Sequence, residues 1–211
     1  MKTTKVRKAR FVGSATNIRR VMAMATSADY AEGMAWYSNA HLEALRIVSP
    51  IPEVAAGMVA AMSPGMLWER NIPAAGKVRD VSIDDNMRNC AGLGVRWTNG
   101  LNKAVRILRG ESPDTVLGGR KVRAFYACLV NPRDDYAVCV DGHAFAIWSG
   151  RRVTLDQTPN LTEKRYETIA RAYRKVAKEM NMLPMQVQAI TWVVWRRLHL
   201  DNGQIRLPFT S

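Results

Sequence analysis

The stretch SPDTVLGGRKVRAFYACLVNPRDDYAVCVDGHAFAIW, Ser112–Trp148, indicates three short helices joined by a glycine turn and an extended segment. Ser112 and Pro113 are typical of an N-cap and a first helical residue. The pair Gly118-Gly119 then interrupts the helical pattern, since glycine allows a positive φ and a close approach of the backbone. The sequence therefore predicts a helical hairpin at this point.

A second helix is expected over residues 120–130, because apolar residues recur there at helical spacing: Val122, Phe125, Tyr126 and Leu129. Lys121 belongs to its first turn and lies off that apolar face. The apolar segment 136–140 is expected to be extended. Asp141 follows it and is predicted to cap a third helix that begins at Gly142.

This arrangement resembles the helix-hairpin-helix DNA glycosylase superfamily, the group of endonuclease III and the adenine glycosylases. The family pattern is a glycine hairpin, an Arg-Lys pair opening the second helix, and an aspartate further along. The chain matches it with Gly118-Gly119-Arg120-Lys121 and Asp141, although Thr115-Val-Leu-Gly-Gly119 replaces the usual Leu-Pro-Gly-Val-Gly. The resemblance implies an all-α, two-lobed fold, with Asp141 as the catalytic carboxylate and Lys121 as a Schiff-base nucleophile.

The same resemblance implies a set of DNA-binding residues around the hairpin and the cleft: Gly118, Gly119, Arg120, Arg123, Ser63 and His143. The backbone N–H groups of a glycine-rich turn before a helix can hold a phosphate group. Simpler interpretations remain open for three side chains. Asp141 is also a plain N-cap, Lys121 a phosphate-contacting or solvated lysine, and His143 a packing or phosphate-contacting histidine.

A second segment, residues 63–75, resembles the region of endonuclease III-like proteins that faces the flipped base. The chain keeps a serine, Ser63, and an asparagine, Asn71, ahead of an alanine pair. It has Pro64-Gly65 where some relatives carry a glutamine that enters the DNA. Ser63 followed by Pro64 also fits an ordinary N-cap and first helical residue.

The remaining candidates for a base pocket or a wedge are three aromatic side chains and the asparagine of that segment: Trp36, Tyr37, Trp68 and Asn71. Trp36 and Tyr37 are adjacent, so they are not expected to face the core together. One of them is a candidate for stacking on a base. Burial in the core or an interface is the commoner role for such residues.

The rest of the chain predicts further helices, with breaks near Ser27 and at Pro50 and Pro52. Helices are expected within 15–48, over 53–62, 101–109 and 162–180, and from Pro184 onward, with a loop-rich region over 77–100. The expected organisation is a basic tail, 1–14, and one helical domain, 15–211. Its two lobes are 51–140, with the hairpin at 113–130, and 15–50 plus 141–200.

The net charge and the cysteine content limit the kinds of partner and cofactor that are expected. The 211 residues carry a formal net charge of +13, which favours a polyanion, and double-stranded DNA is the expected partner. No apolar run is long enough for a bilayer span, so no membrane association is expected. The three cysteines match neither a metal site nor the four-cysteine iron–sulfur cluster of some family members, so no cofactor is expected. A monomer in the cytoplasm of a bacterium or a phage-infected cell is expected.

Two further questions stay open at the level of sequence. Residues 1–14 fit a solvated tail, an arm that contacts phosphates or a transit peptide. The expected function is base excision by cleavage of an N-glycosidic bond, with or without cutting of the strand at the abasic site. The alternatives are a non-catalytic DNA-binding protein of the same fold and a phage enzyme that modifies DNA bases.

Overall fold

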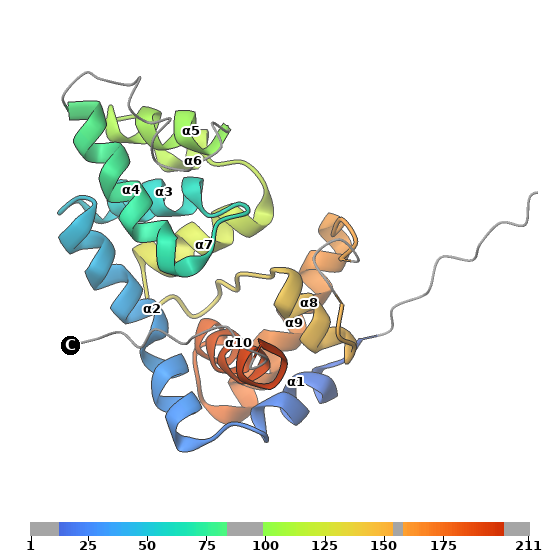
Figure 1. Cartoon of the computed structure of the whole chain (residues 1–211). Coiled ribbons are helices and arrows are strands. Elements are labelled where there is room, and N and C mark those ends of the chain that lie inside the picture. The colour runs from blue at the N-terminus through green and yellow to red at the C-terminus, as the bar shows by residue number, and fades with distance from the viewer. Residues whose placement is uncertain (1–12, 84–98, 154–157, 201–211) are drawn as a thin grey trace, which may run out of the picture.

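The computed structural model describes residues 13–83, 99–153 and 158–200, and the described chain is helical without strands. The helices are α1 (Ala15–Met22), α2 (Ser27–Ile47), α3 (Pro52–Met62), α4 (Trp68–Ile83), α5 (Asn99–Leu108), α6 (Pro113–Val116), α7 (Arg120–Val130), α8 (Gly142–Ser149), α9 (Glu163–Met180) and α10 (Pro184–Leu200). The prediction of an all-α chain is confirmed (Figure 1). Most of the predicted tail, and residues 84–98 of the predicted loop-rich region, lie outside the described residues.

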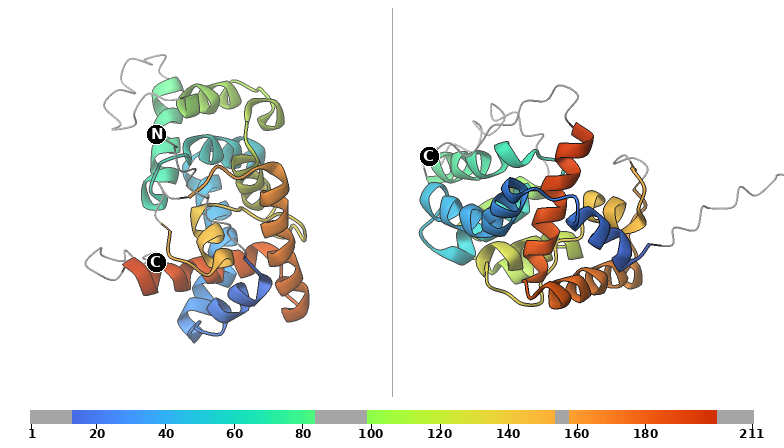
Figure 2. Two further views of the ribbon diagram at one scale, coloured as in Figure 1. Left: turned by 90° about the vertical axis from the view of Figure 1, so that its right-hand side faces the viewer. Right: turned by 90° about the horizontal axis from the view of Figure 1, so that it is seen from below.

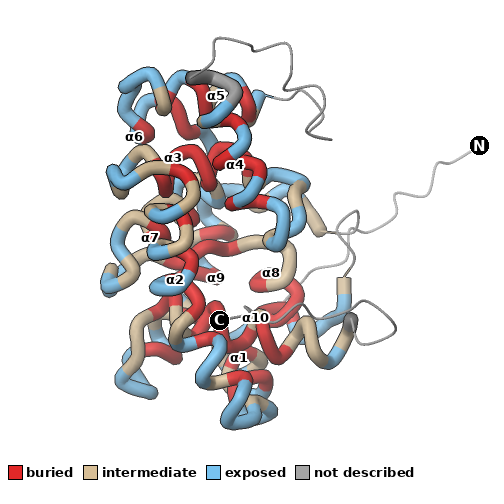
Figure 3. The backbone as a smooth tube through the Cα atoms, turned by 60° about the vertical axis from the view of Figure 1, so that its left-hand side comes forward, coloured by how far each residue is buried: buried red, intermediate tan, exposed pale blue. Residues whose placement is uncertain are grey.

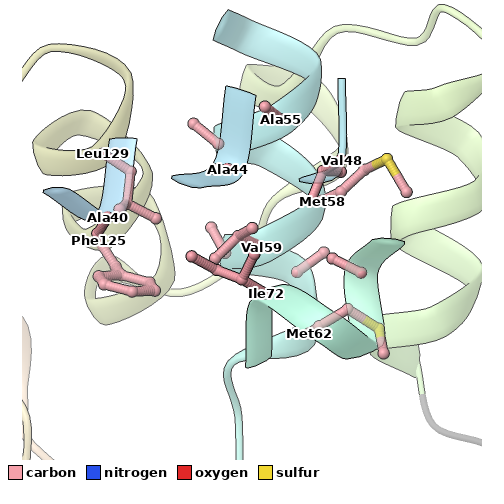
Figure 4. Packing of buried hydrophobic residues seen from close by; sticks show 14 of the residues in the cluster. Ala40, Ala44, Val48, Ala55, Met58, Val59, Met62, Ile72, Phe125 and Leu129 are labelled. Atoms are coloured by element: carbon pink, nitrogen blue, oxygen red, sulfur yellow. The ribbon is translucent and has the colours of Figure 1, made fainter. Parts of the chain in front are cut away.

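The buried side chains form two hydrophobic clusters, here called the hairpin core and the terminal core. The hairpin core is built by α3, α4, α5 and α7 together with residues 36–47 of α2, its C-cap Val48, and Met185 and Ala189 of α10. Figure 4 shows its centre, where α2, α3 and α7 meet through Ala40, Ala44, Val59, Phe125 and Leu129. The terminal core is built by α1, α8, α9 and α10. Two views show α5 and α6 at one end of the molecule and α1 at the other (Figures 1 and 2).

Helix α2 contributes to both cores, whereas the sequence assigned residues 15–50 to the second lobe alone. Tyr30, near its start, packs on the terminal core, and Trp36 to Val48 belong to the hairpin core. The helix is long and extends from one group of helices to the other, with buried residues along much of its length (Figure 3). Its contact with α10 is close at Gly33, where an added Cβ would lie 2.5 Å from Ile190 Cα.

Two boundaries differ from the predictions. Ser63 is not an N-cap: it ends α3, and its hydroxyl donates to the Ala60 carbonyl at 2.9 Å. The next helix starts only at Trp68, because Gly65 adopts a positive φ of 73° that interrupts the helix. That helix, α4, then continues to Ile83 through the region predicted as loop from residue 77. Its buried face, Ala75 and Val78 included, packs on the hairpin core, and this tertiary contact outweighs the weak local helix signal.

Candidate functional site

The predicted helical hairpin is present and its turn is open to solvent. Gly118 and Gly119 are exposed, and Gly119 has a φ of 76°, which favours glycine. The turn is closed by Arg123, whose Nε donates to the Leu117 carbonyl at 2.8 Å. Gly119 is the N-cap of α7 and supplies no side-chain acceptor, so the first amides of α7 have no side-chain cap. Such a turn can receive an anion.

Arg120, at the start of α7, interacts with side chains of α9, a helix of the terminal core. Its guanidinium forms an ion pair with Glu163 and lies 4.0 Å from a carboxylate oxygen of Glu167, both on α9. The same group lies 5.9 Å from the centre of the Tyr166 ring. Arg120 therefore links α7 to α9 and is engaged by carboxylates, as Arg123 is engaged by the turn. Neither of these predicted DNA-binding arginines is free in this conformation.

Lys121 and Asp141 both influence the buried thiol of Cys139. Lys121 is exposed, and its backbone carbonyl accepts from Cys139 Sγ at 3.8 Å. Burial raises the pKa of Cys139 to about 12; the negative charge of Asp141 adds to this rise, and the positive charge of Lys121 opposes it. The two predicted catalytic residues thus act on one buried group from two different elements. Cys139 lies two residues before Asp141, so its contact with the Lys121 carbonyl brings the segment before α8 to the first turn of α7.

Asp141 is the N-cap of α8, as predicted. Its Oδ1 accepts from the Ala144 N–H at 2.8 Å, and its side chain is half-buried. It is thus neither fully exposed nor sealed in the interior. Burial is the main cause of the raised pKa of the Tyr37 hydroxyl, and the negative charge of Asp141 adds to this rise.

The position of Asp141 depends on a hydroxyl that the sequence did not single out. Tyr166 of α9 donates to the Val138 carbonyl at 2.9 Å and accepts from the Val140 N–H at 3.1 Å. It thereby satisfies two buried backbone groups of the extended segment immediately before Asp141. Tyr166 is buried in α9, which corresponds to the helix predicted over 162–180. A side-chain pattern carries no signal for a hydrogen bond to a segment 28 residues away.

The two adjacent aromatic residues of α2 are both buried, which corrects the expectation that only one could face the core. Trp36 is 7% exposed and Tyr37 is 5% exposed. Both can be buried because α2 is covered on two sides, by α10 and by the helices of the hairpin core. The ring of Trp36 packs on Trp68 at 4.5 Å and on Trp192 at 5.6 Å between centroids, and Tyr37 Oη donates to Gln188 at 2.9 Å. In this conformation both are core residues.

Other predicted residues of the base region differ in their surroundings. Trp68 is half-buried at the start of α4, and Asn71 is 2% exposed with a carbonyl oxygen, Oδ1, that has no hydrogen-bond partner among the described residues. Ser63 uses its hydroxyl within α3, and His143 is half-buried in the first turn of α8. Leu67, which the sequence did not single out, is 66% exposed in the loop before Trp68. The only sequence signal for this exposed residue is that an apolar side chain closely follows Pro64-Gly65.

Comparison with known proteins gives one match. A family model described as "Family of unknown function (DUF7178)" matches residues 1–199. The chain belongs to this family. No curated protein and no solved structure matches it.

In the described part of this DUF7178 protein, no group of three His, Cys, Asp or Glu side chains could hold a metal ion. No single described helix has the length and apolarity to cross a membrane; α2 and α3 reach them only as a pair, across a bend of 104°. A surface hollow of this DUF7178 chain lies between α1, α2 and α9, and Asp141 is not among its lining residues.

Proposed function

We propose that the protein is a helical DNA glycosylase that flips a base out of duplex DNA and cleaves its N-glycosidic bond. The observation that carries the proposal is the open glycine hairpin, whose first helical turn contacts Cys139 through the Lys121 carbonyl, two residues before the capping Asp141. The net charge of +13 supports a nucleic-acid substrate. The order of elements, hairpin, extended segment and Asp-capped helix, supports the resemblance to the helix-hairpin-helix glycosylases.

The carboxylate has the chemistry that base excision requires. Departure of a base leaves positive charge on C1′ of the sugar, and a fixed negative charge beside it stabilises that transition state. The Ala144 N–H fixes the orientation of the Asp141 carboxylate at the N-terminus of α8. One carboxylate oxygen, Oδ1, accepts the hydrogen bond that caps α8. The other oxygen, Oδ2, is the one proposed to face the sugar.

Lys121 is proposed as the nucleophile of a second step. Its exposed amine forms no ion pair or hydrogen bond within the described part of the chain. A neutral lysine amine can attack C1′ as the base leaves; loss of a proton from the resulting adduct and ring opening give an imine, which permits elimination of the 3′ phosphate. The bond to the base breaks, the C1′–N bond forms, and the base leaves with a proton from solvent.

A panel of duplexes, each containing one modified base, tests the proposal. We expect release of the base from at least one duplex by the wild-type protein. Asp141→Asn should slow release by orders of magnitude because it keeps the cap and removes the charge. The matched control is Asp135→Asn, at an exposed carboxylate of the preceding loop. Base release that is equal in Asp141→Asn and Asp135→Asn would overturn the assignment of Asp141.

Covalent trapping tests Lys121 on the same duplexes. Borohydride should reduce the imine and leave a protein–DNA adduct with the wild-type protein and with Lys164→Gln, a control at an exposed lysine of α9. Lys121→Gln should form none. If base release requires Asp141 while the wild-type protein is never trapped, the enzyme cleaves only the glycosidic bond and Lys121 contacts DNA.

A second candidate is a DNA-binding protein of the same fold without catalysis. The observation that favours it is the hydrogen bond from Ala144 to Asp141, because a capping aspartate needs no catalytic role. Salt-dependent binding of duplex DNA, with no base released from the whole panel, would favour this candidate.

A further inference from the structure

Lys103 brings a positive charge from α5 to the glycine hairpin. A Cβ built on Gly118 would lie 3.5 Å from Lys103 Nζ, so the ammonium group lies against the turn. Lys103 is half-buried, and its side chain has no hydrogen bond or ion pair to any described residue. The carboxylate that follows α5, Glu111, is already paired with Arg106. A half-buried ammonium group with no partner among the described residues is available to pair with an anion that approaches the turn.

The hairpin's own arginines cannot take this role in the observed conformation. Arg120 pairs with Glu163 and Glu167 of α9, and Arg123 donates to Leu117 within the turn. Lys121 is exposed in the first turn of α7, and the proposed function assigns its amine to the reaction. Lys103 places an ammonium group against the exposed glycines, and this group has no hydrogen bond or ion pair to a described residue.

We infer that Lys103 is the cation that binds a DNA backbone phosphate at the hairpin, together with the amides of the first turn of α7. This inference rests on the proposed function and deepens it. The site is shared by two elements: the hairpin provides directed N–H donors, and α5 provides the charge. A lysine suits this role because its ammonium is a compact charge that binds one phosphate oxygen without a fixed fork geometry. The contact carries no base information, so it acts on all DNA sequences alike.

The test is the binding of an undamaged duplex, followed by fluorescence anisotropy over a series of salt concentrations. Each phosphate contact contributes about 0.9 to the slope of log affinity against log salt concentration. Lys103→Gln should reduce the slope by about that amount, and Lys103→Arg should retain it. Lys178→Gln, with the same change of charge at an exposed site on α9, should leave the slope unchanged.

Substitutions of Gly118 provide an independent check that leaves Lys103 itself intact. Gly118→Ala should bind like the wild type, because a contact of 3.5 Å to Lys103 Nζ is ordinary van der Waals distance. Gly118→Leu should displace the ammonium and reduce the slope as Lys103→Gln does, and combining the two should add little. Melting temperatures within a few degrees of the wild type would show that both variants fold.

The outcomes separate the two proposals. If the wild-type protein binds duplex DNA with a steep salt dependence, but Lys103→Gln matches Lys178→Gln, then Lys103 is not a phosphate ligand and the proposed function is untouched. If the wild-type protein shows no salt-dependent binding of duplex DNA, both the proposed function and this inference are overturned.

Discussion

Asp29 and Arg197, 168 residues apart in the sequence, form an ion pair in which Nη2 lies 2.8 Å from Oδ2. The Asp29 side chain is 3% exposed and the Arg197 side chain is 26% exposed. Asp29 also completes the capping box of α2 with Thr26, and Arg197 donates to the Met24 carbonyl at 2.9 Å. One carboxylate thus fixes the start of α2 and joins it to the end of α10.

We expect this pair to make stability depend on acid pH. Burial raises the pKa of Asp29, but the hydrogen bonds from Arg197 and Thr26 outweigh it, and the net pKa is below the ordinary value. A carboxyl with a depressed folded-state pKa stabilises the protein fully above its unfolded value of about 3.9, and this contribution is lost as pH falls through the folded pKa. Asp29→Asn should lower the free energy of unfolding by about 2 kcal/mol at pH 7.

Denaturant titrations of the wild type and Asp29→Asn between pH 7 and pH 3 measure this effect. The gap between the two proteins should shrink at the acid end of the series. Glu179→Gln, at the exposed partner of Arg19, is the control and should change little. A constant gap down to pH 3 would contradict the assignment to the Asp29 charge.

Tyr166→Phe should both destabilise the protein and misplace Asp141. Removing the hydroxyl leaves the Val138 carbonyl and the Val140 N–H buried without a partner, at a cost of about 1–3 kcal/mol. Base release should fall further than the folded fraction does, because the segment before Asp141 loses its support. Denaturant titration and single-turnover release measure the two effects. Tyr136→Phe, at an exposed tyrosine that packs on Arg174, should leave both unchanged.

Asn71→Leu should leave the melting temperature unchanged or raise it. The side chain is buried and Oδ1 has no partner, so replacing it with an apolar group of similar size removes a desolvated acceptor. Asn71→Asp should lower the melting temperature, because it buries a charge without a partner. A marked destabilisation by Asn71→Leu would mean that a buried water satisfies Oδ1. Loss of base release in a stable Asn71→Leu variant would assign the amide to the substrate.

Gly33→Ala should destabilise the protein by about 1–3 kcal/mol or more, although alanine favours helix formation elsewhere by about 1 kcal/mol. The added Cβ would lie 2.5 Å from Ile190 Cα and 2.7 Å from its nitrogen, so backbone rather than a flexible side chain must move. Thermal unfolding measures the change. Ser38→Ala, at an exposed site on the same helix, should be neutral or slightly stabilising. Equal melting temperatures for the two variants would show that α2 and α10 can separate at little cost.

Local chemistry explains why much of the fold was predictable. The Gly118-Gly119 turn, the Asp141 cap and the Thr162 cap of α9 are set by residues within a few positions of one another. The Asp141 and Lys121 assignments came from the resemblance, and the structure adds their common neighbour, Cys139. Their catalytic roles remain predictions.

Contacts between distant segments explain what the sequence did not indicate. To predict the burial of both Trp36 and Tyr37, one must know that α2 is covered on two sides. The engagement of Arg120 by Glu163 depends on how α7 packs near α9, and the place of Lys103 depends on the path of the chain from α5 to the hairpin. Ser63 was misassigned because Ser-Pro fits the start of a helix, whereas the chain here ends one.

The sharing of α2 between two cores also bears on how the chain can be divided. The hairpin core needs Trp36 to Val48 of α2, and it takes Met185 and Ala189 from α10 as well. A fragment that begins at residue 51 would therefore expose the apolar surface that those residues cover, and so would the remainder after excision of 51–137. Neither half can be exchanged for a foreign module or prepared alone. Calorimetry of the whole chain should give a single transition with equal van't Hoff and calorimetric enthalpies.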